Sequence, residues 1–145
     1  MLFAEFNPLN DSPLISPALQ CLHIAGLVVS IGTIAIADFR VLGLGMRRNS
    51  AAEIAKDLAL WTTAGLAVAL LSGALLFMSD PDEYYLNRSF QVKMTLLLAA
   101  LIFHYTAHDK VLRGDASSLS GKLGACLSLA LWVGVIAGGI FIGFA

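Results

Sequence analysis

The sequence predicts an all-α fold: an integral membrane four-helix bundle with antiparallel up-down topology. Of the 145 residues, 58% are hydrophobic and only 13% are charged, whereas about 25% of the residues in soluble domains are charged. The mean hydropathy is +0.81. Four apolar segments are long enough to cross about 30 Å of hydrocarbon as helices. We therefore expect a single membrane domain that covers residues 1–145.

Hydropathy and local start and stop signals place the four helices. Ser50 and Glu53 form a capping-box pattern, which begins the second helix before it enters the membrane. Pro81 prevents that helix from continuing, and Asn87 or Ser89 can cap the third helix. Because the connections are short, consecutive helices should be antiparallel neighbours. The expected helices cover residues 17–37, 51–78, 90–107 and 121–144, with spans at Pro17 to Ala37, Leu58 to Met78, Phe90 to Ala107 and Gly121 to Phe144.

Basic residues predict the orientation of these helices in the membrane. They concentrate in the first and third connections: Arg40, Arg47, Arg48 and Lys56 in the first, and Lys110, Arg113 and Lys122 in the third. The second connection has Arg88 as its basic residue and is otherwise acidic and aromatic. Because cytoplasmic loops carry an excess of lysine and arginine, both termini should be extracytoplasmic.

The chain has three histidines, and two of them, His23 and His104, lie inside predicted spans. A polar ring in a membrane span usually faces a partner, a cofactor or a cavity. Each of these two histidines is therefore either a metal or haem ligand or hydrogen-bonded to a carbonyl or hydroxyl of a neighbouring helix. His108 precedes Asp109 and Lys110 at the cytoplasmic edge, so we expect it to be a solvated interfacial residue rather than a ligand.

The depth of each residue in the membrane, calculated from the helical rise, relates the histidines to Lys93. With a rise of about 1.5 Å per residue, His23 lies roughly 8–9 Å and Lys93 roughly 5 Å below the outer edge, but His104 roughly 20 Å. His23 and Lys93 therefore share a level, and His104 belongs to a second site unless a helix is strongly tilted. Lys93 and His104 project from one face of the third helix. Alternatively, the Lys93 amine reaches lipid phosphate at the interface.

Small residues mark where helices should approach closely. Gly134 and Gly138 form a small-xxx-small pair on the fourth helix, and Gly65 and Gly73 thin one flank of the second. Such pairs favour close helix packing. They would also leave room for a flat macrocycle.

Other polar residues favour ordinary structural roles. Asp38 and Arg40 are spaced too closely to face one direction, and we expect Asp38 to cap the inner end of the first helix. Cys21 and Cys126 lie near opposite faces of the bilayer, so no disulfide can join them. No zinc-type cluster, phosphate-binding glycine loop or nucleophile triad is visible, and no catalytic residue is predicted.

Several short motifs carry a resemblance to known membrane proteins. They are Leu22-His23-Ile24, the run Phe90-Gln91-Val92-Lys93 that leads through leucines to Phe103-His104, the run Ala37–Gly43, and Asn87-Arg88-Ser89-Phe90. Together they resemble the superfamily of four-helix bacterial membrane proteins that includes the HemJ-type protoporphyrinogen oxidases and the CopD-type copper-resistance proteins. Within it, the chain looks most like an uncharacterised family of short bacterial proteins.

The resemblance implies one or two haem b groups and the bacterial cytoplasmic (inner) membrane. A first-helix histidine and a third-helix lysine are the functional polar residues of the HemJ-type proteins, and they correspond to His23 and Lys93. The expected cofactor-binding residues are thus His23, Lys93 and His104, with His23 and His104 as metal ligands. The aromatic tryptophan-glycine segment of those enzymes is replaced here by Val29-Ser30-Ile31-Gly32, which argues against porphyrinogen oxidation. Scattered methionines argue against a copper path.

We therefore expect a haem b-binding, cytochrome-like membrane protein that transfers electrons, at most an oxidoreductase component. It could act as a small subunit of a respiratory-type complex. A copper-handling membrane protein and a haem-free structural subunit are the alternatives. The expected partners are membrane lipids and either further copies of the chain or a larger membrane complex, with no nucleic acid among them.

Overall fold

The computed structural model describes residues 9, 13–44, 48–108, 110 and 119–142. Its helices with defined bounds are α2 (Ile15–Val41), α3 (Ala51–Ser79), α4 (Pro81–Tyr85), α5 (Arg88–Thr106) and α7 (Leu119–Ile142). No strand occurs in the described part of the chain. The prediction of an all-α protein is therefore confirmed.

Helix α2 ends at Val41, further along the chain than the predicted residue 37, and a glycine terminates it two residues later. Gly43 has a φ of +79°, a conformation that glycine adopts at little steric cost. The backbone N–H groups of Gly43 and Leu44 donate to the carbonyls of Arg40 (3.0 Å) and Phe39 (2.8 Å), as in a Schellman motif. The predicted capping role of Asp38 is therefore wrong, because Asp38 lies inside the helix.

The start signals of α3 and α5 act as the sequence predicts. The Ser50 hydroxyl accepts from the Glu53 N–H, and the Glu53 carboxylate accepts from the Ser50 N–H, so the capping box is formed. The Asn87 side chain accepts from the N–H groups of Ser89 and Phe90. Its amide also donates to the Ile142 carbonyl at 3.0 Å, which joins the start of α5 to the end of α7.

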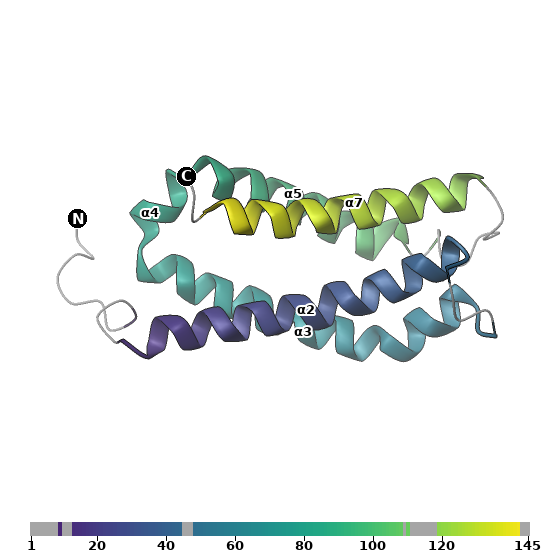
Figure 1. The fold of residues 1–145 in the computed structure, drawn as a ribbon, viewed down its shortest axis with the longest axis horizontal. Coiled ribbons are helices and arrows are strands. Elements are labelled where there is room, and N and C mark those ends of the chain that lie inside the picture. Colours follow the sequence, from purple (N-terminus) through teal and green to yellow (C-terminus); the bar gives the residue numbers. More distant parts are fainter. Residues whose placement is uncertain (1–8, 10–12, 45–47, 109, 111–118, 143–145) are drawn as a thin grey trace.

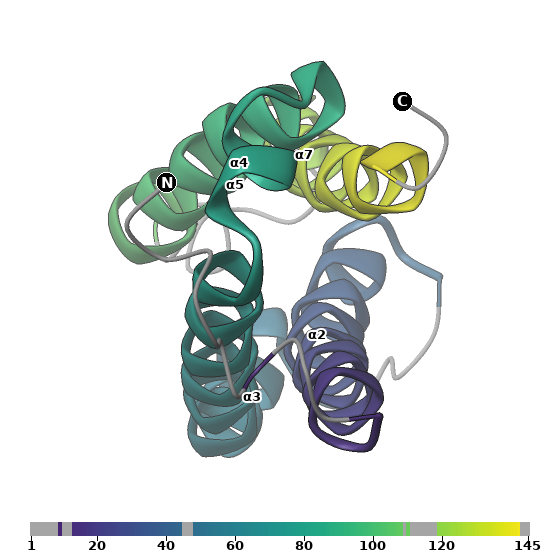
Figure 2. The ribbon, with the colours of Figure 1, turned by 90° about the vertical axis from the view of Figure 1, so that its left-hand side faces the viewer.

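The chain reverses direction between consecutive long helices (Figure 1). Helix α2 packs against α3 and α5 packs against α7, and α2 also contacts α7. Seen end-on, the α2–α3 pair lies below the α5–α7 pair, with α4 linking α3 to α5 (Figure 2). The core between the pairs is built around Trp132, packed with Ile34, Leu66, Leu97, Ala100 and Val135.

Two glycines let α2 and α3 approach to backbone contact. A Cβ added to Gly26 would lie 2.7 Å from the Gly65 carbonyl oxygen and 2.7 Å from the Ala69 nitrogen. A Cβ added to Gly65 would lie 2.8 Å from the Gly26 carbonyl oxygen. Side-chain-free surfaces of this kind hold membrane helices together by close van der Waals contact. The predicted packing role of Gly65 is thus confirmed.

Among the described residues, three helices are long and apolar enough to cross a membrane: α2, α3 and α7. Large apolar side chains cover their outer surface, with Leu60 77% exposed, Leu71 69% and Val133 61%, as lipid contact requires. Helix α5 does not meet the same measure because Arg88, Gln91, Lys93 and His104 interrupt its apolar sequence. Its 19 residues still correspond to about 28 Å of helix.

Candidate functional site

The candidate functional residues form two groups at different levels of the helices. The first group, the outer pair, consists of His23 on α2 and Lys93 on α5. The Lys93 Nζ lies 3.3 Å from the His23 Nε2. The prediction that these two residues share a level is therefore confirmed. Lys93 reaches an imidazole inside the protein, and both side chains are half-buried.

The backbone of α3 determines which nitrogen of His23 faces Lys93. The His23 Nδ1 lies 2.7 Å from the Ala69 carbonyl oxygen, which accepts hydrogen bonds only. Nδ1 must therefore carry the proton, and in the neutral ring Nε2 keeps its lone pair. The Lys93 amine donates to this lone pair. One of the expected alternatives, a histidine bonded to a carbonyl of a neighbouring helix, thus describes Nδ1 but not Nε2.

Three glycines surround the outer pair. A Cβ at Gly73 of α3 would lie 3.0 Å from the His23 Cε1. A Cβ at Gly138 of α7 would lie 2.9 Å from the Lys93 Cβ, and one at Gly139 would lie 3.4 Å from the Lys93 Nζ. We call these three residues the glycine cradle. The predicted close contacts of Gly73 and Gly138 are confirmed, and both contacts are made to candidate site residues.

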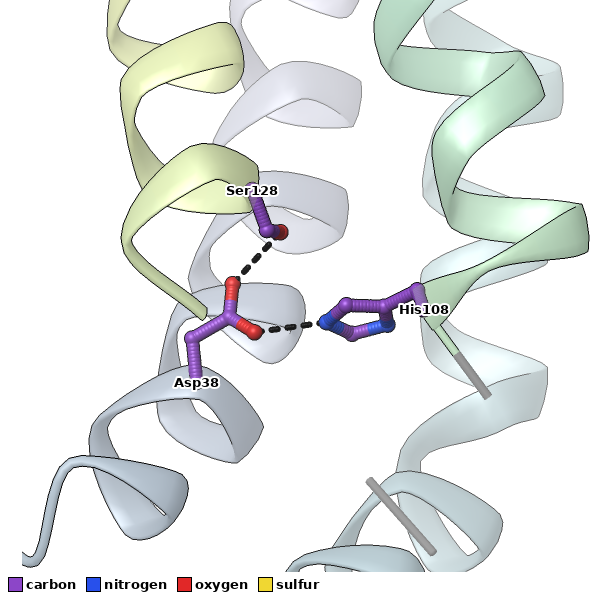
Figure 3. A network of polar contacts seen from close by, with 3 residues as sticks. All are labelled: Asp38, His108 and Ser128. Carbon is purple, nitrogen blue, oxygen red and sulfur yellow. Dashed lines mark hydrogen bonds and ion pairs between the residues drawn. The ribbon is translucent and has the colours of Figure 1, made fainter. Parts of the chain in front are cut away.

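The second group, the inner network, joins three segments through one carboxylate. Asp38 of α2 accepts from the His108 Nε2 at 2.6 Å through Oδ1 and from the Ser128 hydroxyl of α7 at 2.7 Å through Oδ2. Figure 3 shows the carboxylate between its two donors. The exposed fractions are 0% for Asp38, 2% for His108 and 1% for Ser128. The network therefore lies fully inside the protein.

The inner network corrects one further prediction. His108 was expected to be solvated, but it is buried and bonded to Asp38. The reason is a tertiary contact, because a carboxylate 70 residues earlier in the chain offers the ring a partner that water would otherwise provide. Helical spacing could have indicated Asp38, which continues the buried face of Ser30, Ile34 and Ala37. No local signal marked Ser128.

His104 lies beside His108 and makes no hydrogen bond with His23 or Lys93 of the outer pair. The ring centroids of His104 and His108 are 5.1 Å apart, with the ring planes inclined at 37°. The His104 Nδ1 is buried and has no hydrogen-bond partner among the residues that the structure describes. The indole N–H of Trp132 shares this property. A polar atom left in this state costs roughly 1–3 kcal/mol.

His104 and His108 also line a groove whose other walls are formed by α2 and α3. Its volume is about 440 Å³, within the range of about 300–1,000 Å³ typical of ligand sites. Its walls combine small or hydroxylated side chains with a few charged or ionisable groups, among them Glu53, His104 and His108.

Neither group supplies enough protein ligands for a complete metal centre. The described part of the chain contains no group of three or more histidine, cysteine, aspartate or glutamate side chains arranged so that they could hold a metal ion. Cys21 and Cys126 form no disulfide, as expected from their separation, and both are exposed. The outer pair offers two nitrogen donors, and the inner network offers a histidine held by a carboxylate.

Comparison with known proteins assigns the chain to a family. Residues 14–145 match a family of unknown function, DUF6644. The chain belongs to this family. No curated protein and no solved structure matches it.

Proposed function

We propose that the protein binds haem b and transfers electrons in the bacterial cytoplasmic membrane. His23 is the proposed axial ligand. Lys93 is either the second ligand or the partner of a haem propionate. Haem b supplies reversible one-electron exchange at its iron, and axial ligands set the potential of that exchange.

One observation carries the proposal: the His23 Nε2 lone pair is presented to the Lys93 amine, while Nδ1 is fixed on the Ala69 carbonyl. Histidines that bind metals usually donate their other ring N–H to a carbonyl or carboxylate, which fixes the ring orientation. No carboxylate is paired with Lys93 among the described residues. The amine is therefore available to a ligand atom or to an anionic group.

The surroundings of the outer pair fit the same function. The glycine cradle removes side chains from α3 and α7 at the points where His23 and Lys93 lie. The resemblance of this histidine and lysine to the functional residues of the HemJ-type proteins supports the assignment.

We further propose a four-helix membrane bundle in which α5 is the fourth span and both termini are extracytoplasmic. The basic residues at one end of the helices support this topology. The half-polar face of α5 would then be covered by neighbouring helices, by further copies of the chain or by a larger complex. Reporter tags at Ser118 and at Ala145 should label from opposite sides of the membrane, and external labelling of Ser118 would refute the topology.

Absorption spectroscopy of the purified full-length protein, expressed with haem supply, tests the haem assignment. The wild type should show a Soret band and, after reduction, α and β bands. The His23→Ala variant should lose the haem group that the outer pair binds, so its haem content per chain should fall by one. Lys93→Met should shift the spectrum if the amine is a ligand, or lower occupancy with an unchanged spectrum if it holds a propionate.

Two variants serve as matched controls. Lys122 is exposed, so Lys122→Met should leave the spectrum and stoichiometry unchanged. His104→Ala should also retain the haem of the outer pair. A wild type without haem refutes the function, and a His23→Ala variant with wild-type haem content refutes the assigned ligand.

A further inference from the structure

A second chemical site lies at the inner network, where the haem proposal assigns nothing. His104 lies in the last turn of α5, and His108 follows two residues after the end of that helix at Thr106. Their four-residue spacing is also found in motifs that bind a single metal ion through two histidines. Both rings line the groove whose other walls are formed by α2 and α3.

The distance between the two rings matches a shared metal ion. Two imidazoles bound to one tetrahedral metal have ring centroids about 5 Å apart, because each metal–nitrogen bond is about 2.0–2.1 Å. The His104 and His108 centroids are 5.1 Å apart.

Asp38 gives His108 the surroundings of a metal ligand. The His108 Nε2 N–H donates to the Asp38 carboxylate, so in the neutral ring the lone pair lies on Nδ1. A carboxylate behind a histidine fixes its orientation and raises its basicity toward a metal. Ser128 holds the other oxygen of the same carboxylate, which prevents Asp38 from turning away.

The unpartnered nitrogen of His104 is an independent indication of a ligand. Its Nδ1 is buried without a hydrogen-bond partner among the described residues, although buried polar atoms in folded proteins are nearly always bonded. A metal ion would satisfy this ring. The nearby Asp38 carboxylate is engaged by His108 and Ser128, and the described residues hold no group of three or more histidine, cysteine, aspartate or glutamate side chains that could bind a metal ion. The remaining coordination positions would therefore open to the groove.

We propose that His104 and His108, the latter positioned by Asp38 and Ser128, bind one divalent transition-metal ion at the inner end of the groove. Imidazole ligands suit copper, zinc, iron and nickel, and copper binds most strongly in this series. Water or a small exogenous ligand completes the coordination. This site is separate from the outer pair and does not depend on the haem proposal.

Copper titration of the full-length protein tests this site. The parent is a Cys21→Ser, Cys126→Ser double variant without a histidine tag, since exposed thiols would bind copper themselves. After chelator treatment, one Cu²⁺ per chain should bind, with an electron paramagnetic resonance spectrum split by imidazole nitrogens. His104→Ala and His108→Ala should each weaken binding at least tenfold. Asp38→Asn should weaken it by about 10–100-fold, the usual effect of losing a carboxylate behind a ligand.

The controls separate a ligand role from a structural one. His104→Ala leaves the contacts among Asp38, His108 and Ser128 intact, so its fold, checked by circular dichroism and gel filtration, should match the parent. His23→Ala should bind copper as the parent does even if it loses haem. The proposal is overturned if the parent binds no stoichiometric copper, if His104→Ala binds it equally well, or if His23→Ala abolishes it.

Discussion

The outer pair and the inner network are built from similar residues but stabilised in different ways. His23 and Lys93 are half-buried and meet without a carboxylate, and they pack against glycines at which an added Cβ would collide with them. Asp38 and His108 are fully buried around a carboxylate with two donors. The outer pair therefore depends on how closely the helices approach, whereas the inner network depends on a set of short hydrogen bonds.

Because of this difference, we expect the outer pair to accept a ligand readily, whereas the inner network mainly stabilises the fold. An amine facing an imidazole lone pair can exchange its partner at little cost, because both groups remain partly accessible. A buried carboxylate with two donors cannot lose a partner without leaving polar atoms unsatisfied. We therefore expect substitutions at the outer pair to affect the ligand first, and substitutions at the inner network to affect stability first.

The largest expected effect is the loss of stability in Asp38→Ala. The change leaves the His108 N–H and the Ser128 hydroxyl without their acceptor, at roughly 1–3 kcal/mol for each buried donor. His23→Ala removes the hydrogen bond to the Ala69 carbonyl and the one from the Lys93 amine, at only about 0.5–1.5 kcal/mol each because the site is half-buried. Thermal unfolding in detergent, followed by circular dichroism, gives both values.

Asp57→Ala is the matched control for this comparison. Asp57 is exposed on α3, and its replacement should change the free energy of unfolding by no more than about 0.5 kcal/mol. If Asp38→Ala were no more destabilising than His23→Ala, the distinction between the two groups would be lost.

The sequence predicted the outer pair better than the inner network for a physical reason. His23 and Lys93 could be related by helical rise alone, because both lie near the same ends of apolar spans. The contacts of His108 with Asp38 and of Asp38 with Ser128 could not be found in this way, because the depth of a residue does not say which faces of the helices meet. Such pairings depend on how α2, α5 and α7 are rotated about their axes. The hydropathy of an apolar span does not determine this rotation, because most of its faces are equally apolar.

Local signals were reliable where the chemistry is local. Ser50 with Glu53 and Asn87 begin their helices as predicted. The end of α2 was missed because Asp38 and Arg40 look like a terminus in an apolar sequence. A carboxylate inside the helix becomes acceptable only when partners from other helices are present.

An intermediate effect is expected where α2 crosses α3. Gly26→Ala places a Cβ within 2.7 Å of backbone atoms of Gly65 and Ala69, so the helices must separate, at about 1–3 kcal/mol for overpacking. Because Ala69 also holds the His23 Nδ1, haem content should fall as well. Copper binding at the inner network should change little.

Gly32→Ala on the same helix is the control. Nothing lies within 4 Å of a Cβ at Gly32, and alanine is the better helix former by roughly 0.5–1 kcal/mol. Its unfolding temperature should be unchanged or raised. Equal destabilisation by both substitutions would mean that the α2–α3 contact is not what holds the outer pair in place.

The smallest expected effect compares two glycines on α7 that face α5. A Cβ at Gly134 would meet the tip of Leu96, with Cδ1 at 2.9 Å, and a leucine tip can rotate away. A Cβ at Gly138 would lie 2.9 Å from the Cβ and 3.1 Å from the Cα of Lys93, atoms that move only with the backbone of α5. Gly138→Ala should therefore be less stable than Gly134→Ala by about 1 kcal/mol. If the Lys93 amine is a haem ligand, Gly138→Ala should also shift the haem spectrum, which Gly134→Ala should leave unchanged, because of these two substitutions only the one at Gly138 displaces Lys93. Identical spectra together with equal haem occupancy in the two variants would show that Lys93 does not act on the haem.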